Sequence, residues 1–173
     1  MIFLPSGWQA FWKEGMVNWK GERLESTLKE INGLKLAGVK NSIGYLLRRA
    51  NKRARDMTIP ILAKHGLSPL ELTTLYLVNE NRDCTLRSLA KGVFLEPPAM
   101  HRLLNGLEKK GLISRHKSGQ DARFTFTRIT RAGQKKISNS IDEINKVEHI
   151  FLGKLDRNQK EMLITILNKL ALE

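Results

Sequence analysis

The chain has 173 residues, of which 41% are hydrophobic, so it is long enough and apolar enough for one packed domain. Thirty Lys and Arg against seventeen Asp and Glu give a formal net charge of +13, which predicts a polyanionic partner. The single cysteine excludes an intrachain disulfide framework and a cysteine-rich zinc site. No apolar run is typical of a membrane span, so we expect a cytoplasmic protein with no membrane segment, whose polyanionic partner is either nucleic acid or an anionic membrane surface.

Residues 1–40 differ from the rest because they hold all three tryptophans. An amphipathic stretch follows through Leu24, Leu28 and Ile31. Two interpretations remain open for this N-terminal extension. It is either an extra helix that packs on the body, or upstream sequence read from a wrong start, with Met16 as the true one.

The first clear helical pattern covers residues 41–64, where apolar side chains recur at three- and four-residue steps. Pro60 is expected to kink this helix or to mark its last turns, and Gly66 suits its end. Ser68 to Glu71 then form a capping box, in which Ser68 accepts from a free backbone N–H and Glu71 reaches back. This box predicts a second helix that runs to about Asn79.

Two further helices are expected before residue 112. Thr85 can cap a short helix over residues 86–91. Pro97 and Pro98 then open a fourth helix, which Gly111 closes, because proline is favoured in a first helical turn and glycine just past a helix end.

A β-ribbon and two helices complete the pattern. Residues 112–116 and 124–129 predict its strands, with 117–123 as the loop. Thr130 caps a long helix with apolar positions at helical spacing, and the capping box from Asp156 to Gln159 begins the last helix.

The order of elements predicts a mainly α fold with a small β-wing, that is, a winged helix-turn-helix flanked by helices from both chain ends. We expect residues 67–129 to form the DNA-binding lobe, and residues 41–66 and 130–173 to form a helical dimerisation region. The flanking helices carry more apolar surface than a three-helix domain covers, which favours a two-fold homodimer. The alternative is a monomer whose own termini pack together.

The fourth helix is the candidate DNA-recognition helix. Its spacing buries Met100, Leu103, Leu104 and Leu107. The opposite face then presents polar candidates for base contact, because Arg can bind guanine, Asn can bind adenine, and His can contact a base or a phosphate. The residues on this opposite face are Pro98, Arg102, Asn105 and Lys109, with His101 beside them.

The ribbon loop is polar and basic at both ends, with Lys117 and Arg123 as its candidate DNA contacts. A wing of this kind can place one arginine in a narrow, A·T-rich minor groove, and Arg123 is the candidate. Asp121 makes most sense as an internal partner that shapes the loop by pairing with Arg115 or Arg123.

Several short motifs together resemble the MarR family of dimeric winged-helix transcriptional regulators. The clearest are LEKKGLISR from Leu107 to Arg115, D-x-R at Asp121 and Arg123, and I-T-x-x-G at Ile129, Thr130 and Gly133. Weaker matches are Leu67-Ser68, Leu89-Ala90 and Pro98-Ala99-x-x-Arg102. The resemblance covers about residue 41 to the C-terminus, and it departs from the family at Thr125 and Thr127, where aliphatic residues are usual.

The resemblance implies a sequence-specific regulator, usually a repressor, that binds a pseudo-palindromic operator. It implies base contacts from residues 98–102, among them Ala99, a minor-groove role for Arg123 and a structuring role for Asp121. It also implies a small effector, often phenolic or anionic, that binds beside the dimer helices and releases DNA. Candidate lining residues for that pocket are Tyr45, Arg49, His65 and Tyr76.

Other functions remain as alternatives. A non-specific DNA-binding or recruiting winged helix would share the same charge. A redox-sensing regulator is a further alternative, in which Arg82, Arg87 and a nearby helix N-terminus would lower the pKa of Cys84. The simpler interpretation is that Cys84 is a small side chain with no redox role. An enzyme, a metal site or a cofactor is not expected, since the four histidines are scattered and no phosphate-binding glycine loop or nucleophile elbow is found.

Overall fold

The structure, a computed structural model, describes residues 30–31, 34–36, 39, 41–117 and 125–171. The chain divides into two compact units, residues 1–53 and 54–173, and helix α2 (Ile43–Lys64) runs through the boundary. Most of the N-terminal extension lies outside the described residues. No helix among the described residues is long and apolar enough to cross a membrane.

The first unit holds a short antiparallel pair, β1 (Glu30–Ile31) with β2 (Leu34–Lys35). Ile31 therefore lies in a strand, so an extra helix, one of the two interpretations of the N-terminal extension, does not include this position. The sequence between the two strands is Asn-Gly, the dipeptide that most favours a two-residue hairpin turn.

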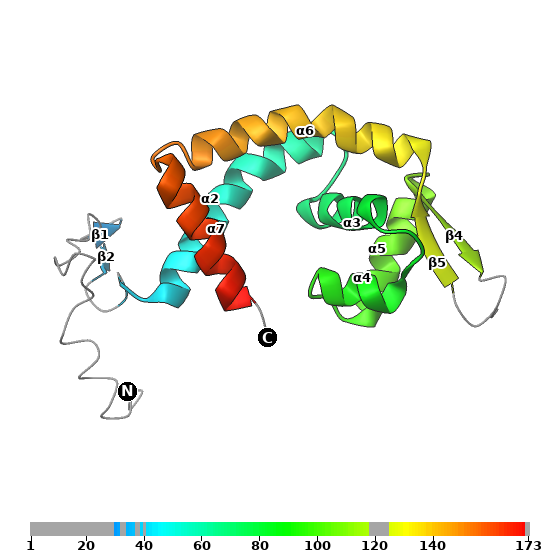
Figure 1. The fold of residues 1–173 in the computed structure, drawn as a ribbon, viewed down its shortest axis with the longest axis horizontal. Coiled ribbons are helices and arrows are strands. Elements are labelled where there is room, and N and C mark those ends of the chain that lie inside the picture. The colour runs from blue at the N-terminus through cyan, green and yellow to red at the C-terminus, as the bar shows by residue number, and fades with distance from the viewer. Residues whose placement is uncertain (1–29, 32–33, 37–38, 40, 118–124, 172–173) are drawn as a thin grey trace, which may run out of the picture. The chain divides into compact units, whose positions relative to one another are not determined.

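The second unit contains a winged helix, as predicted. Helices α3 (Pro69–Glu80), α4 (Leu86–Gly92) and α5 (Pro97–Lys109) pack together beside a ribbon of β4 (Ile113–Lys117) and β5 (Thr125–Ile129) (Figure 1). Two more helices follow, α6 (Arg131–Phe151) and α7 (Arg157–Ala171).

The sheet has a third strand that the sequence pattern did not predict. β3 (Cys84–Thr85) pairs with β5, so that the strand order is β3-β5-β4 and all neighbours are antiparallel. Thr127 lies opposite both Cys84 and Arg115, and its side chain is buried. Thr127 therefore occupies a core-facing position, where the resemblance predicted an aliphatic residue.

Local signals place the helix ends. Ser68 and Glu71 form both hydrogen bonds of the predicted capping box, and Thr130 accepts from the backbone N–H of Gly133. Gly66 and Gly111 have φ of 65° and 68°, in the left-handed region that glycine adopts without strain and that commonly ends a helix.

The hydrophobic core of the second unit forms where α5 packs against its neighbours. The largest fully buried apolar side chains are Leu62, Leu75, Met100, Leu104 and Leu107. Three of these lie on one side of α5, so the predicted buried face of this helix is confirmed. Their burial fixes which face of α5 remains outside.

Candidate nucleic-acid interface

The outer face of α5 carries the predicted base-contacting residues. Pro98, His101 and Arg102 are exposed, and Ala99 is partly buried. Arg102 has no ion-pair partner among the residues that the structure describes. Its guanidinium is therefore available to a partner outside the protein, as a base contact requires.

Asn105 lies on the same helix but is already engaged. Its side-chain oxygen accepts from Arg115 Nη2 at 2.7 Å, and its side-chain nitrogen lies 3.3 Å from His101 Nδ1. The structure thus brings Asn105, His101 and Arg115 together, and Asn105 connects the recognition helix to the wing strand β4.

Arg115 also pairs with Glu108, a contact that sequence analysis missed. Its Nε donates to Glu108 Oε2 at 2.9 Å, and its Nη2 contacts the same oxygen. The hydrogen bond from Arg115 is the largest cause of the lowered pKa of Glu108. The predicted alternative partner, Asp121, and the minor-groove candidate, Arg123, lie outside the described residues.

A second ion pair holds the other wing strand. Arg128 on β5 donates through Nε to Asp83 at 2.7 Å, and its Nη2 lies 2.6 Å from the same carboxylate oxygen. Asp83 has φ of 57° and lies directly before β3. Lys117, the remaining wing candidate within the described residues, is exposed at the end of β4.

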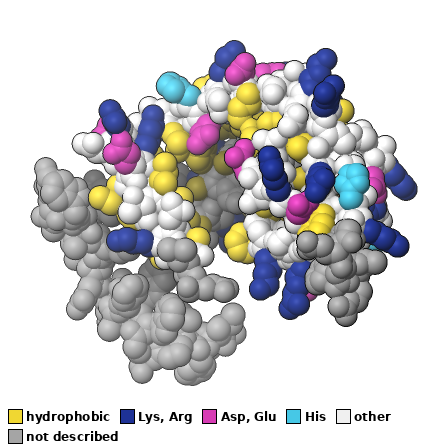
Figure 2. All heavy atoms as spheres, turned by 45° about the vertical axis from the view of Figure 1, so that its right-hand side comes forward, with side chains coloured by type: hydrophobic (Ala, Val, Ile, Leu, Met, Phe, Trp, Pro, Cys, Tyr) yellow, Lys and Arg dark blue, Asp and Glu magenta, His cyan; other side chains and the backbone are white. Residues whose placement is uncertain are grey.

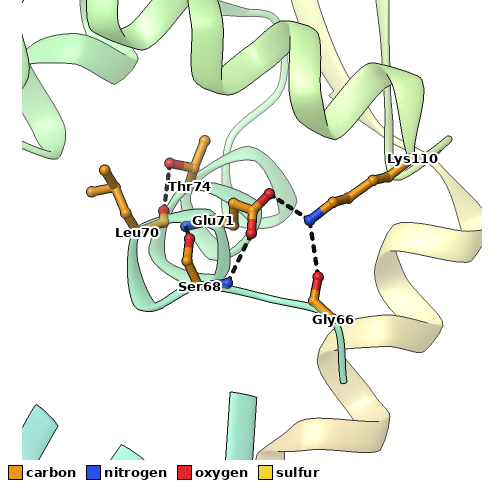
Figure 3. Close-up of polar contacts among 6 residues, drawn as sticks. All are labelled: Gly66, Ser68, Leu70, Glu71, Thr74 and Lys110. Carbon is orange, nitrogen blue, oxygen red and sulfur yellow. Dashed lines mark hydrogen bonds and ion pairs between the residues drawn. The ribbon is translucent and has the colours of Figure 1, made fainter. Parts of the chain in front are cut away.

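Lys110, just past the end of α5, has a structural contact that the sequence pattern did not predict. Its ammonium donates to Glu71 and to the backbone oxygen of Gly66 (Figure 3). The exposed basic side chains that remain are spread over the visible face, interspersed with fewer Asp and Glu (Figure 2). This distribution gives a broad positive field that attracts a polyanion.

The four effector-pocket candidates divide between the two units. In the first unit, the Arg49 guanidinium lies 5.7 Å from the centre of the Tyr45 ring. In the second unit, His65 Nε2 is 3.0 Å from Glu143, and the Tyr76 hydroxyl is buried without a hydrogen-bond partner among the described residues. Burial also raises the pKa of Tyr76.

Two open cavities of about 400 and 270 Å³ lie near the start of β3, and both are lined in part by Asn81, Arg82 and Asp83. None of the four predicted effector residues lines either of them. The structure therefore leaves the effector pocket a prediction.

Cys84 does not have the environment predicted for a redox sensor. The side chain is 7% exposed, and burial raises the pKa of its thiol, with a further increase from the Asp83 carboxylate. The lowering by Arg82 and Arg87 that a redox sensor would need is not found, because a buried thiolate is poorly solvated and the Asp83 carboxylate disfavours its negative charge. Within the described ranges, no group of His, Cys, Asp and Glu could hold a metal ion.

Comparison with known proteins identifies the lobe. A model of the MarR family matches residues 65–123, the stretch from just before α3 through the wing loop. The resemblance to the MarR family is confirmed. Within this fold, α4 and α5 form the helix-turn-helix, and β4 and β5 form the strands of the wing.

Solved MarR-like structures share the fold over most of their length. The transcriptional repressor CouR bound to a 23-mer DNA duplex has a TM-score of 0.76 at 24% identity, covering 80% of this chain and 99% of CouR. BpsR of Bordetella bronchiseptica, whose DNA binding is regulated by 6-hydroxynicotinic acid, has a TM-score of 0.73 at 16% identity. The match covers 78% of this chain and 96% of BpsR. MepR of S. aureus in complex with DNA has a TM-score of 0.68 at 22% identity, covering 75% of this chain and 96% of MepR.

Proposed function

We propose that the protein is a sequence-specific regulator of transcription that binds double-stranded DNA through α5 and the wing. The observation that carries this proposal is the exposed face of α5, where Arg102 and His101 are presented outward while the opposite face is locked into the core. Helices of this type place side chains near their N-terminus against base edges in the major groove. Two structural neighbours, CouR and MepR, are themselves bound to DNA, which supports the assignment.

Arg102 is the proposed principal base contact, and its replacement tests the proposal. Selection from randomised duplexes should enrich an inverted repeat with half-sites about ten base pairs apart. Arg102→Ala should then weaken the free energy of binding to the enriched site by roughly 1–3 kcal/mol and relax the sequence preference at one base pair. Lys109→Met is the matched control, because an exposed lysine at a phosphate should weaken enriched and scrambled duplexes alike. Equal losses on both duplexes for Arg102→Ala would reassign it to the backbone.

The wing is proposed to add contacts on the minor-groove side. The Arg115–Glu108 pair holds β4 against α5, and the Arg128–Asp83 pair holds β5 against the segment before β3, so both strands that border the loop are supported. Arg123→Ala should weaken binding most on duplexes with A·T-rich flanks, where the minor groove is narrow. Insensitivity to flank composition would remove Arg123 from the groove, and Lys117→Ala serves as the phosphate-contact control.

A homodimer is proposed as the binding form, with residues 67–129 as the DNA-binding lobe and residues 41–66 and 130–173 as the dimerisation region. Helix α7 supports it, because none of its residues is buried and it exposes large apolar side chains. They are Met162, Ile164, Ile166, Leu167 and Leu170. A soluble chain normally buries such a patch against a partner, and a two-fold dimer would match an inverted repeat in the DNA.

We further propose that the protein is a repressor released by a small anionic aromatic effector. CouR is a repressor, and BpsR is regulated by an aromatic acid. The buried Tyr76 hydroxyl, which has no hydrogen-bond partner among the described residues, can form a hydrogen bond with such a ligand. Aromatic acids and phenols should therefore displace the protein from its enriched duplex, and Tyr76→Phe should raise the concentration needed. Failure of every compound in both classes would contradict this part of the proposal.

The alternative is a non-specific DNA-binding protein, favoured by the net charge of +13 and by the wide spread of its basic side chains. Such a protein would enrich no sequence, and its affinity would fall with salt identically on all duplexes.

A further inference from the structure

A line of hydrogen bonds connects the wing strand β4 to the outer face of α5. Arg115 Nη2 donates to Asn105 Oδ1 at 2.7 Å, and the Asn105 nitrogen lies 3.3 Å from His101 Nδ1. Glu108 holds the other side of the guanidinium through Arg115 Nε at 2.9 Å. Arg115 is partly buried and His101 is exposed, so the line runs from the protein towards the surface proposed to face DNA.

The chemistry of Arg115, Asn105 and His101 fixes which atom donates and which accepts in each of these hydrogen bonds. A guanidinium has only donors, so the Asn105 atom that faces Arg115 must be its carbonyl oxygen. The amide nitrogen that then faces His101 can only donate, and the ring atom that it meets must accept. His101 Nδ1 is therefore without a proton in the neutral ring, and the proton is on Nε2.

We propose that Arg115 and Asn105 are positioning residues that fix His101 as its Nε2–H tautomer, so that His101 presents a hydrogen-bond donor to a purine N7. This inference rests on the DNA-binding function proposed above. His101 Nε2 has no hydrogen-bond partner among the described residues, which leaves the donor available. The opposite tautomer would present an acceptor and would suit the amino group of cytosine or adenine instead. The line of hydrogen bonds therefore sets which base edge His101 prefers.

Asn105 changes role as a consequence. Bidentate binding of adenine needs the amide oxygen to accept from N6 while the amide nitrogen donates to N7. In this structure the amide oxygen instead accepts from Arg115 and the amide nitrogen faces His101, so the orientation of the Asn105 side chain is set by these two contacts. Under the proposal, the main role of Asn105 is to act through His101.

The tautomer can be observed without DNA. In the full chain labelled with ¹⁵N-histidine, long-range ¹H–¹⁵N correlations distinguish a protonated Nε2 from a protonated Nδ1, and His101→Gln identifies the His101 signals. At a pH where the ring is neutral, we expect the Nε2–H form in the wild type. Asn105→Leu and Arg115→Met should each give a mixture of tautomers.

Arg128→Met is the matched control, because it removes the other ion pair of the wing but no contact to α5. It should keep the wild-type tautomer. Asn105→Leu leaves the Arg115–Glu108 pair intact, so it remains informative if Arg115→Met does not fold. An Nδ1–H form or a mixture in the wild type, or no change in Asn105→Leu, would overturn the proposal.

The base contact is tested on the enriched duplex by replacing single purines with 7-deazapurines, which lack the N7 acceptor. Wild type should lose affinity roughly threefold to tenfold at one position in each half-site, the factor expected of one hydrogen bond. This sensitivity should vanish in His101→Gln, diminish in Asn105→Leu and persist in Arg128→Met. If no position depends on His101, the base contact is refuted. If no duplex is enriched at all, the DNA-binding function fails while the tautomer experiment still judges the positioning roles.

Discussion

Lys110 ties the end of the recognition helix to the start of α3. Its ammonium donates to Glu71 Oε1 at 2.7 Å and to the backbone oxygen of Gly66 at 2.9 Å (Figure 3). The same Glu71 carboxylate closes the capping box by accepting from the backbone N–H of Ser68. One lysine thus supports the turn before α3 and the position of α5 at once.

Replacing Lys110 should destabilise the fold modestly. Because its side chain is 42% exposed, we expect Lys110→Met to lower the free energy of unfolding by about 1 kcal/mol. Urea denaturation measures this change. Lys109→Met is the neighbouring control and should stay within about 0.5 kcal/mol of wild type. An equal loss in both variants would remove the special role of Lys110.

The Lys110 contact also predicts a pH dependence. Burial raises the pKa of Glu71, but the hydrogen bond and positive charge of Lys110 and the hydrogen bonds with Ser68 together outweigh it, so that the pKa lies below the ordinary value of a glutamate. A carboxylate with a lowered pKa contributes stability that is present above its unfolded pKa and is lost as pH falls through the folded one. Wild type should therefore lose stability on acidification below about pH 4.5. Lys110→Met should show a shallower loss, and parallel pH profiles would contradict this account.

Phe94, in the turn between α4 and α5, should be replaceable with a gain in stability. It is 89% exposed and has φ of 57°, a left-handed conformation that costs a residue with a Cβ roughly 1–2 kcal/mol. Phe94→Gly removes this strain and loses little packing. After the added freedom of the unfolded chain, the free energy of unfolding should rise by roughly 0.5–1 kcal/mol.

A glycine of similar backbone conformation gives the opposite control for Phe94. Gly111 has φ of 68°, and a Cβ added there would meet no atom within 4 Å, so Gly111→Ala should be destabilising through backbone strain alone. Thermal unfolding of both variants shows whether stability rises in Phe94→Gly and falls in Gly111→Ala. A fall in stability for Phe94→Gly would show that its side chain makes a contact worth more than the strain.

Gly133 should tolerate no side chain. A Cβ at this position would lie 2.2 Å from the backbone oxygen of Leu112 and 2.7 Å from Ile129 Cγ1. The start of α6 packs there directly on the end of the wing, so Gly133→Ala should destabilise by about 3 kcal/mol. Calorimetric unfolding tests this, with Ala132→Gly as an exposed neighbour expected to change far less. A near-wild-type Gly133→Ala would mean that α6 can shift away from the wing.

Charges on α7 should break the proposed dimer. Leu167→Lys and Leu170→Lys place an ammonium in the exposed apolar face and should shift sedimentation from dimer to monomer. Asn168→Lys adds the same charge away from the Leu167 and Leu170 side chains, at the edge of the apolar face, and should weaken the dimer far less. Unchanged sedimentation in both leucine variants would place the dimer contact elsewhere.

Local signals explain why most helix ends were predictable. The Ser68, Thr85 and Thr130 caps act within three residues of their partners, so the sequence contains both members. β3 has only two residues and no periodicity to detect, and its pairing depends on β5, which lies about forty residues further along the chain.

The functional face was predicted less completely, because its polar contacts depend on how elements pack. Helical spacing correctly separated the outer face of α5 from its buried face. The spacing could not show that Arg115 reaches back to Glu108 and Asn105, which depends on the angle between β4 and α5. Likewise, the Asp83–Arg128 pair joins residues 45 positions apart, and the burial of Cys84 follows from the strand that was missed.

The central claim is that α5 recognises a DNA sequence, and fluorescence-anisotropy titration tests it most directly. The full chain would be titrated against the DNA upstream of its own gene, against the duplex enriched by selection, and against scrambled duplexes at several salt concentrations. We predict a preference of at least about a thousandfold for the enriched duplex that survives at higher salt and falls sharply in Arg102→Ala. Equal affinity for all duplexes, lost together as salt rises, would contradict the account and leave only general attachment to DNA.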